Sequence, residues 1–250
     1  ETGSGGTTGE ETGSGGTTGE ETGSGGTTGE ETGSGGTTGG GVIVDASGLV
    51  FDDYVLDITA IENSGSVKLK GDASVVDAQD GSVIRFDGDG DAAKLGRLTE
   101  FEESEQLAFM IEFTRDEADG SSQRLIWNKG HLGLTLKGDG LVAHVADSDG
   151  KLKGFKVDDL GLNDTDTHKI IMLVDQESDR LQVLVDDVLV FEETDTDFEF
   201  VEGTHGGRQW GWNLGFEWGR YVDGEVSAFA IDDDVDFVNP TTFQGDDLFV

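Results

Sequence analysis

The clearest β-strand pattern in this chain is QWGWNLGFEW, residues 209–218. Large apolar side chains occupy every second position, and small or polar ones fall between them. Successive side chains of a β-strand point to opposite faces, so this alternation predicts a strand with one face against a core and one face open. The tryptophans are expected to be mainly core rather than a sugar-stacking platform, with only those at the two ends reaching a loop surface. The inward set is Trp210, Trp212, Leu214, Phe216 and Trp218.

Short β-type runs continue on both sides of this stretch, from residue 42 onward. In QLAFMIEF, Leu107, Phe109, Ile111 and Phe113 share one face, and residues 168–193 form a predicted hairpin. Gly, Asp, Asn or Ser interrupt the runs at a spacing of roughly 8–12 residues, as in antiparallel sandwiches and barrels. Only one helical turn is expected, within LTEFEESEQ. We therefore predict an all-β chain with two packed antiparallel sheets, and we favour a jelly roll over a closed barrel.

The chain divides into three parts by composition. Residues 1–41 repeat ETGSGGTTGE, which has no large apolar residue and cannot bury a core. We predict a disordered linker there, with an ordered glycine-rich fibre or an O-glycosylated stalk as alternatives. Residues 42–240 form the predicted β domain, and 241–250 form a tail. Since the first residue is not methionine and lies inside a repeat, we expect a piece of a longer protein.

Charge and cysteine content exclude several classes of function. The chain has 53 acidic and 16 basic residues and a formal net charge of −37. Such a field repels nucleic acid and anionic membranes and attracts cations. Without cysteine, neither a disulfide nor a thiolate metal site can form. The simplest explanation of the charge is solubility in a salty medium, and calcium binding is the more specific one.

Five runs occur in an order that resembles the concanavalin A-like, laminin-G-like jelly-roll family, across residues 81–238. They are SVIRFDGDGDAAKLG, LAFMIEFTRD, LIWNKGHLGLTLKGDGLVAHVAD, DTHKIIMLVDQESDRLQVLVDDVLV and LGFEWGRYVDGEVSAFAI. The resemblance implies two curved antiparallel sheets, calcium at one edge, and a ligand at the concave face or the loop rim. Two departures stand out: Thr167 replaces a tryptophan, and Asp186-Asp187 replaces the Asp-Gly of a tight turn.

The last six residues, GDDLFV, resemble the start of a nonapeptide calcium repeat of RTX-like proteins. An ordinary acidic tail is the alternative. Together with the acidic charge, the absent cysteines and the repeated spacer, the resemblance favours a large secreted, adhesin-like protein at a cell surface.

Two acidic loops are candidate calcium sites, because calcium takes six to eight oxygen ligands. The first, DGDGD, offers Asp87, Asp89 and Asp91. It lacks the glycine and glutamate of an EF-hand, and its alternative role is the turn after a strand. The second loop offers Asp232 and Asp234.

A ligand-binding surface is expected on the open face of residues 209–218 and in the glycine-rich loop before it. Planar donors and a ring in this region can bind hydroxyls and stack on a sugar. The predicted ligand-binding residues are Arg208, Gln209, Trp210, Asn213 and Glu217.

The predicted function is a non-catalytic extracellular module that binds a carbohydrate or another surface ligand with calcium. Besides the glycan, the expected partners are other domains of the same long chain and further copies of this one. A structural spacer or filament unit is the first alternative. A polysaccharide-cleaving enzyme is the second, since EETDTDFEFVE alternates acids along a strand-like run in which Asp197, Glu199 and Glu202 resemble a jelly-roll glycanase motif.

Overall fold

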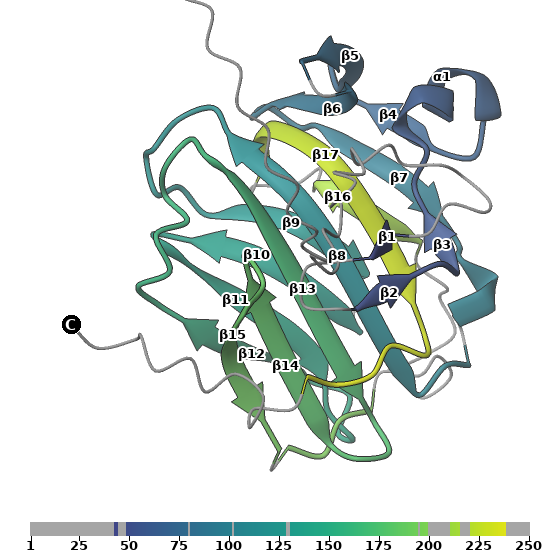
Figure 1. Ribbon diagram of the computed structural model, residues 1–250, viewed down its shortest axis with the longest axis vertical. Helices are drawn as coiled ribbons and strands as arrows, with labels where there is room; N and C mark the ends of the chain where they lie inside the picture. The colour runs from purple at the N-terminus through teal and green to yellow at the C-terminus, as the bar shows by residue number, and fades with distance from the viewer. Residues whose placement is uncertain are drawn as a thin grey trace, which may run out of the picture. The chain divides into compact units, whose positions relative to one another are not determined.

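Two antiparallel sheets, one of eight strands and one of seven, form the domain (Figure 1). The predicted two-sheet sandwich is therefore confirmed. The computed structural model describes residues 43–44, 49–79, 81–101, 103–128, 131–194, 196–199, 211–215 and 221–238. All of them belong to one compact unit, Gly33–Val250. The repeat and the tail predicted at 1–41 and 241–250 lie outside the described residues.

The eight-stranded sheet has the order β15-β14-β13-β8-β17-β6-β5, and β3 pairs with β17 beside this path. All its pairs are antiparallel, and the segments that it brings together come from both ends of the domain. The bounds are β3 (Tyr54–Val55), β5 (Ser74–Ala78), β6 (Gly81–Asp87), β8 (Gln106–Arg115), β13 (Thr167–Asp175), β14 (Arg180–Val185), β15 (Val188–Glu193) and β17 (Asp223–Asp232).

The seven-stranded sheet has the order β12-β11-β10-β9-β16-β7-β4. Its bounds are β4 (Lys68–Lys70), β7 (Ala92–Gly96), β9 (Gln123–Asn128), β10 (Leu132–Lys137), β11 (Gly140–Ala146), β12 (Leu152–Val157) and β16 (Trp212–Gly215). A separate hairpin pairs β1 (Ile43–Val44) with β2 (Val50–Phe51). The helices are η1 (Ile58–Ala60), α1 (Ile61–Ser64) and η2 (Thr99–Phe101), of which only η2 was expected from the sequence.

The main core fills the space between the sheets and confirms the predicted inward faces. Phe109 is 0% exposed, and its ring meets that of Trp212 edge-on, with the centroids 6.1 Å apart. Trp212 and Leu214 are 4% and 0% exposed, as the alternation in QWGWNLGFEW predicts. Trp210, Phe216 and Trp218 lie outside the described residues. Burial of such large apolar surface supplies most of the drive for the two sheets to pack.

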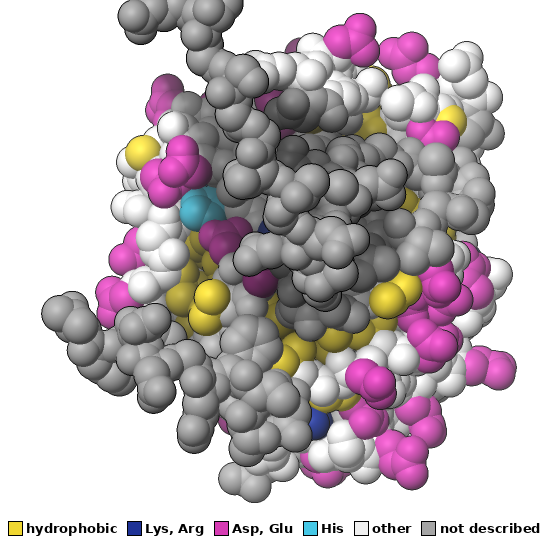
Figure 2. Space-filling model, in the orientation of Figure 1, with side chains coloured by type: hydrophobic (Ala, Val, Ile, Leu, Met, Phe, Trp, Pro, Cys, Tyr) yellow, Lys and Arg dark blue, Asp and Glu magenta, His cyan; other side chains and the backbone are white. Residues whose placement is uncertain are grey.

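A second apolar cluster covers the outer face of the eight-stranded sheet. Segments from the two ends of the domain, around Phe51 and Val238, pack there against outward side chains of β8, β13 and β17. Gln182 is fully buried, and its amide accepts from the Val238 N–H at 2.9 Å and donates to its carbonyl at 2.8 Å. The Gln182 amide thus bonds the backbone of Val238 as a neighbouring strand would, and it holds the segment after β17 in place. Figure 2 shows this side of the molecule, with many Asp and Glu and few Lys or Arg around it.

The β14–β15 turn forms without a glycine, at the Asp186-Asp187 pair. Asp186 and Asp187 both adopt positive φ, 48° and 68°, which matches a two-residue hairpin turn of the primed type. Asp186 Oδ1 accepts from the backbone N–H of Lys169 at 2.9 Å, and its Oδ2 lies 2.8 Å from Nδ1 of His168. Aspartate tolerates this conformation better than most residues, and these bonds compensate its cost.

His168 is held between two carboxylates, because its Nε2 lies 2.9 Å from Asp164 Oδ1. Burial lowers the pKa of the ring, but the bonds to Asp186 and Asp164 outweigh burial and raise the pKa above 6.5. Arg115 also acts on Asp164 from β8. A raised histidine pKa means that its stabilisation is complete below pH 6.5 and is lost as the pH rises through the raised value.

His168→Gln is therefore expected to lower the free energy of unfolding by about 1 kcal/mol at pH 6, with a smaller loss at pH 9. The two partners are about half exposed, which limits the effect. Urea unfolding at both pH values measures it. Asp186→Asn removes the negative charge but keeps a residue that tolerates the positive φ of the turn. This variant should therefore also reduce the pH dependence of the free energy of unfolding. An equal loss at the two pH values for His168→Gln would contradict the account.

Candidate functional site

One row of aligned residues crosses the outer face of the seven-stranded sheet from edge to edge. Each member is the register partner of the next, so the side chains share one face of the pleat. The neighbours Leu134 and Leu214 point the other way, into the core. From β12 to β4, the row consists of Gly154, His144, Gly133, Trp127, Asn213, Lys94 and Lys68.

An aromatic ring lies flat on the middle of this row. A Cβ at Gly133 would come within 2.3 Å of Cε3 of Trp127, so only glycine leaves room for the ring. The Arg124 guanidinium lies above the ring at 3.8 Å from its centroid, a cation–π arrangement. His144 meets the ring edge-on at 5.6 Å, and its Nε2 lies 3.2 Å from Thr135 Oγ1. The result is a layer of planar polar groups over a rigid sheet.

A register shift brings Arg124 and Trp127 to the same face. Residues three apart on a regular strand point to opposite sides. Here β9 pairs Ile126 with Leu134 but Arg124 with Thr135, so Leu125 is the extra residue of a bulge. Sequence reasoning missed this pair because LIW looks like a continuous apolar run. The glycine at position 133 could have indicated that a large side chain packs directly on the strand there.

Asn213 occupies the row on β16, which agrees with its predicted place on the open side of that strand. Its Nδ2 donates to the carbonyl of Gly211 at 2.9 Å and to that of Trp127 at 3.4 Å. The side chain is half-buried and held in place by these two bonds. The other predicted ligand-binding residues, Arg208, Gln209, Trp210 and Glu217, lie outside the described residues.

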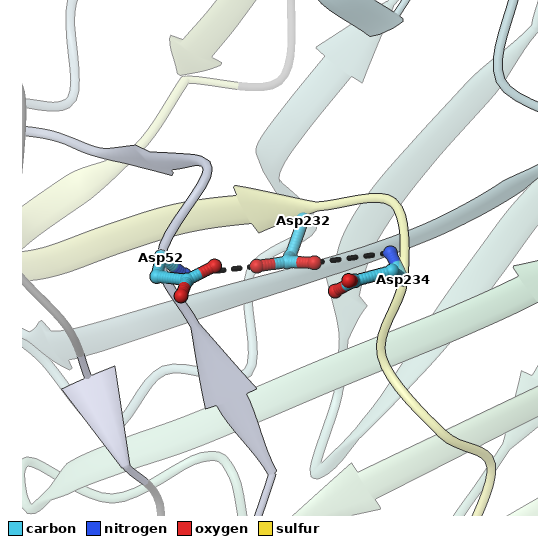
Figure 3. A group of neighbouring side chains, drawn as sticks. All are labelled: Asp52, Asp232 and Asp234. Atoms are coloured by element: carbon cyan, nitrogen blue, oxygen red, sulfur yellow. Dashed lines mark hydrogen bonds between the residues drawn. The ribbon is translucent and has the colours of Figure 1, made fainter.

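An aspartate cluster forms a separate candidate metal centre at the end of β17. Asp232 is fully buried, and its carboxylate accepts from the N–H groups of Asp52 at 2.8 Å, Asp53 at 3.3 Å and Asp234 at 3.0 Å. Figure 3 shows Asp232 between Asp52 and Asp234. Carboxylate oxygens of Asp52, Asp232 and Asp234 lie within 4.8 Å of one another. Ligands about 2.4 Å from one calcium ion fit that limit. A second such group is Asp53, Asp232 and Asp233.

The pKa values in this cluster reflect crowded negative charge. Burial and the neighbouring aspartates raise the pKa of Asp53 to about 6. Hydrogen bonding with Asp232 and its charge raise the pKa of Asp234. Burial also raises the pKa of Asp232, but the N–H bonds from Asp52 and Asp234 outweigh burial, and the net shift is downward. One ionised carboxylate is thus fixed at the centre, and a cation would relieve the repulsion around it.

The first acidic loop is arranged differently. Asp91 is fully buried and binds backbone N–H groups with both oxygens: Asp72 and Ala73 at 2.7 and 3.1 Å, and Asp87 at 2.8 Å. Asp87 Oδ1 accepts from the N–H of Asp89 at 2.9 Å within the turn. Among the described residues, this loop does not form one of the groups with three carboxylates in reach of one ion. Calcium at Asp87, Asp89 and Asp91 remains a prediction.

The predicted alternation of acids along one strand is wrong. β15 ends at Glu193, and the next pairing is a single bridge between Phe198 and Asp147. Phe198 is 1% exposed and turns its ring onto Phe155, so the chain leaves the sheet edge to bury it. Neighbouring like charges also disfavour a regular strand there. Of the glycanase-like acids, Asp197 is exposed, Glu199 is half-buried, and Glu202 lies outside the described residues.

These features define the fold class as an all-β jelly-roll sandwich. In the part of the chain that the structure describes, no helix is long and apolar enough to span a membrane. Comparison of the sequence with protein-family models and with curated proteins gives no match. Many solved structures match the fold.

Three of the similar structures illustrate the fold. Ruminococcus gnavus IT-sialidase CBM40, bound to alpha2,3 sialyllactose, has a TM-score of 0.51 and 12% identity, with 70% of this chain and 95% of that chain covered. Domain 4 of the extracellular arabinanase AbnA from Geobacillus stearothermophilus, in complex with arabinotriose, has a TM-score of 0.50 and 13% identity, with 70% of this chain and 84% of that chain covered. The binding domain of Paraclostridial Mosquitocidal Protein 1 has a TM-score of 0.52 and 12% identity, with 80% of this chain and 49% of that chain covered. This chain thus spans about half of the mosquitocidal binding domain. Identities this low indicate the fold alone.

Proposed function

We propose that this chain is a non-catalytic glycan-binding module of a larger secreted protein, with the outer face of the seven-stranded sheet as its binding face. The observation that carries the proposal is the Trp127 ring laid flat over Gly133 beneath the Arg124 guanidinium. Sugars present flat, hydroxyl-edged rings, and fixed planar polar groups such as those of Arg124 and Asn213 suit them without a large loss of side-chain entropy. This face also contains Asn213, which the sequence placed in a ligand site.

Two of the similar structures support a glycan as the ligand class. One is a CBM40 bound to sialyllactose, and the other is an arabinanase domain in complex with arabinotriose. Both are covered over most of their length by this chain. An extracellular location and an adhesin-like parent protein, one with RTX-like repeats, are part of the same proposal. They rest on the acidic composition and the repeated spacer.

We further propose that calcium binds at the cluster of Asp52, Asp232 and Asp234. This cluster joins the segment before β3 to the end of β17, two parts of the chain that are 180 residues apart. An ion there would neutralise repulsion and stiffen the domain without touching the glycan. Three carboxylates supply part of the six to eight oxygens that calcium takes, and water would complete the shell.

A glycan array with the wild-type chain and Gly133→Ala tests the proposed function. The added Cβ collides with the Trp127 ring and displaces it from under Arg124, so array binding should fall at least about tenfold. Thr114→Ala, on the outer side of β8, is the matched control and should bind as the wild type does. Truncating Arg208 and Trp210 together should also abolish binding with little change in melting temperature.

Three outcomes, from the array, from melting temperatures and from an assay for reducing ends, would contradict non-catalytic glycan binding at this face. In the first, no glycan binds while calcium still raises the melting temperature, which favours a structural spacer. In the second, Gly133→Ala binds normally. In the third, the wild type releases reducing ends from polysaccharides, which would assign it to the enzymes.

A further inference from the structure

Charge is strongly segregated between the two sheets. Acidic residues outnumber basic ones 53 to 16 in the chain, yet none of the seven strands β4, β7, β9, β10, β11, β12 and β16, all of them described, contains Asp or Glu. The basic residues in these strands are Lys68, Lys70, Lys94, Arg124, Lys137, Lys153 and Lys156.

The eight-stranded sheet has the opposite balance. Its basic residues are Arg85, Arg115, Lys169 and Arg180. Its acidic residues are Asp77, Asp87, Glu112, Asp175, Glu192, Glu193, Asp223, Glu225 and Asp232. Two of these four cations form ion pairs inside the sheet, Arg85 with Glu225 and Arg180 with Glu192. Within the described strands, the acidic residues are therefore concentrated in one sheet and absent from the other.

Register places most of the seven-stranded sheet's cations on its outer face. Lys68 and Lys94 are neighbours in the row that contains Trp127. Two more occupy the same face one step along the strands, where Val142 pairs with Lys156 and Thr135 with Arg124. Lys68 and Lys156 are exposed, and Lys156 forms an ion pair with Asp158 at the end of its strand. The face is thus lined by cations beside a stacked guanidinium.

We infer that the ligand of this face is an anionic polysaccharide, one that carries carboxylate or sulfate groups; the inference rests on the proposed glycan-binding function. The Arg124 guanidinium, which lies over the Trp127 ring, is a planar cation of the kind that binds carboxylate and sulfate groups. Lys68 and Lys94 add positive charge to the same face. The net charge of −37 opposes approach from afar, but salt screens that repulsion beyond roughly 8–10 Å, and contacts on the face remain.

Isothermal titration with polygalacturonate, dextran and a dT20 oligonucleotide tests the inference, in EGTA so that calcium cannot bridge two carboxylates. Polygalacturonate should bind, and dextran and dT20 should not. Lys68→Gln/Lys94→Gln should weaken binding roughly tenfold. The matched control Lys151→Gln/Lys153→Gln removes the same charge from exposed positions off this face and should change binding less than about twofold. Raising NaCl from 50 to 500 mM should weaken binding about 100-fold if three contacts release counterions.

Arg124→Lys keeps the charge and loses the planar fork, so a loss of about fivefold is expected with the melting temperature nearly unchanged. Lys68→Glu, on the terminal strand β4, repeats the test at an exposed position that cannot disturb the core.

Each other outcome overturns the inference in a distinguishable way. Binding of neutral dextran or a neutral array glycan, lost in Gly133→Ala, would keep the proposed function and remove the anionic ligand. Polygalacturonate binding that survives Lys68→Gln/Lys94→Gln and Lys68→Glu would put the anion elsewhere. Equal binding of dT20 would indicate a general polyanion surface. Failure of every glycan, on the array and in titration, would remove both proposals.

Discussion

Asp91→Ala is expected to lower the free energy of unfolding by roughly 4 kcal/mol. The carboxylate is fully buried and accepts hydrogen bonds from the backbone N–H groups of Asp72, Ala73 and Asp87. A buried donor left without an acceptor costs about 1–3 kcal/mol, and because these three hydrogen bonds are part-buried, water would recover part of that sum. Chemical denaturation of the domain measures the loss.

Two further variants separate the hydrogen bonds from a metal role at Asp91. Asp91→Asn keeps one acceptor oxygen and should lose about half as much. Gly71→Ala leaves the carboxylate intact but puts a Cβ 2.1 Å from its Oδ1, at a φ of 68°, and should also destabilise. All three losses should be equal with calcium and with EGTA. A loss that appears only with calcium would instead assign residues 87–91 to the metal site that the sequence predicts.

Calcium is expected to raise the melting temperature by about 8 °C at a concentration 100 times its dissociation constant, and Asp232→Asn should abolish that rise. Ligand binding at this excess stabilises by about 2.7 kcal/mol, and 1 kcal/mol shifts a domain of this size by about 2–4 °C. Asp232 belongs to both three-carboxylate groups, so an ion bound at either group would have Asp232 as a ligand. Differential scanning calorimetry with and without calcium measures the increment.

The calcium-induced rise in melting temperature is informative and the absolute melting temperature is not, because Asp232→Asn also weakens the hydrogen bonds from the N–H groups of Asp52 and Asp234. Asp52→Asn and Asp234→Asn change exposed residues and should reduce the increment without that complication. Asp236→Asn, an exposed acid outside both groups, is the control. A wild-type domain that calcium does not stabilise would rule out the proposed site.

The sheets were predictable because alternation is a local property. The inward set on β8 and the burial of Trp212 follow from a period of two, and the core in the structure confirms both. The tight turn at Asp186 was less predictable, because the hydrogen bonds that offset its positive φ come from Lys169 and His168 across the hairpin. The short helix α1 was missed, since four residues are too few to show a helical period.

Both candidate sites depend on information that one strand does not contain. Trp127 and Arg124 share a face only because of the bulge at Leu125, which pairing with β10 reveals. Asp52 meets Asp232 across 180 residues, so the sequence identified only the part of the cluster within one loop. Charge segregation between sheets likewise needs the strand order, because basic runs such as KLK and LKGFKV look unremarkable one at a time.

Amide chemical-shift mapping of the domain with the glycan that the array identifies locates the binding face directly. We expect saturable shifts at Gly133, His144 and Asn213, in the row across the seven-stranded sheet, and none at Ala108, Ile171 or Leu184 under the covered face of the other sheet. Shifts confined to that other face, or to the aspartate cluster, would contradict the proposed binding face.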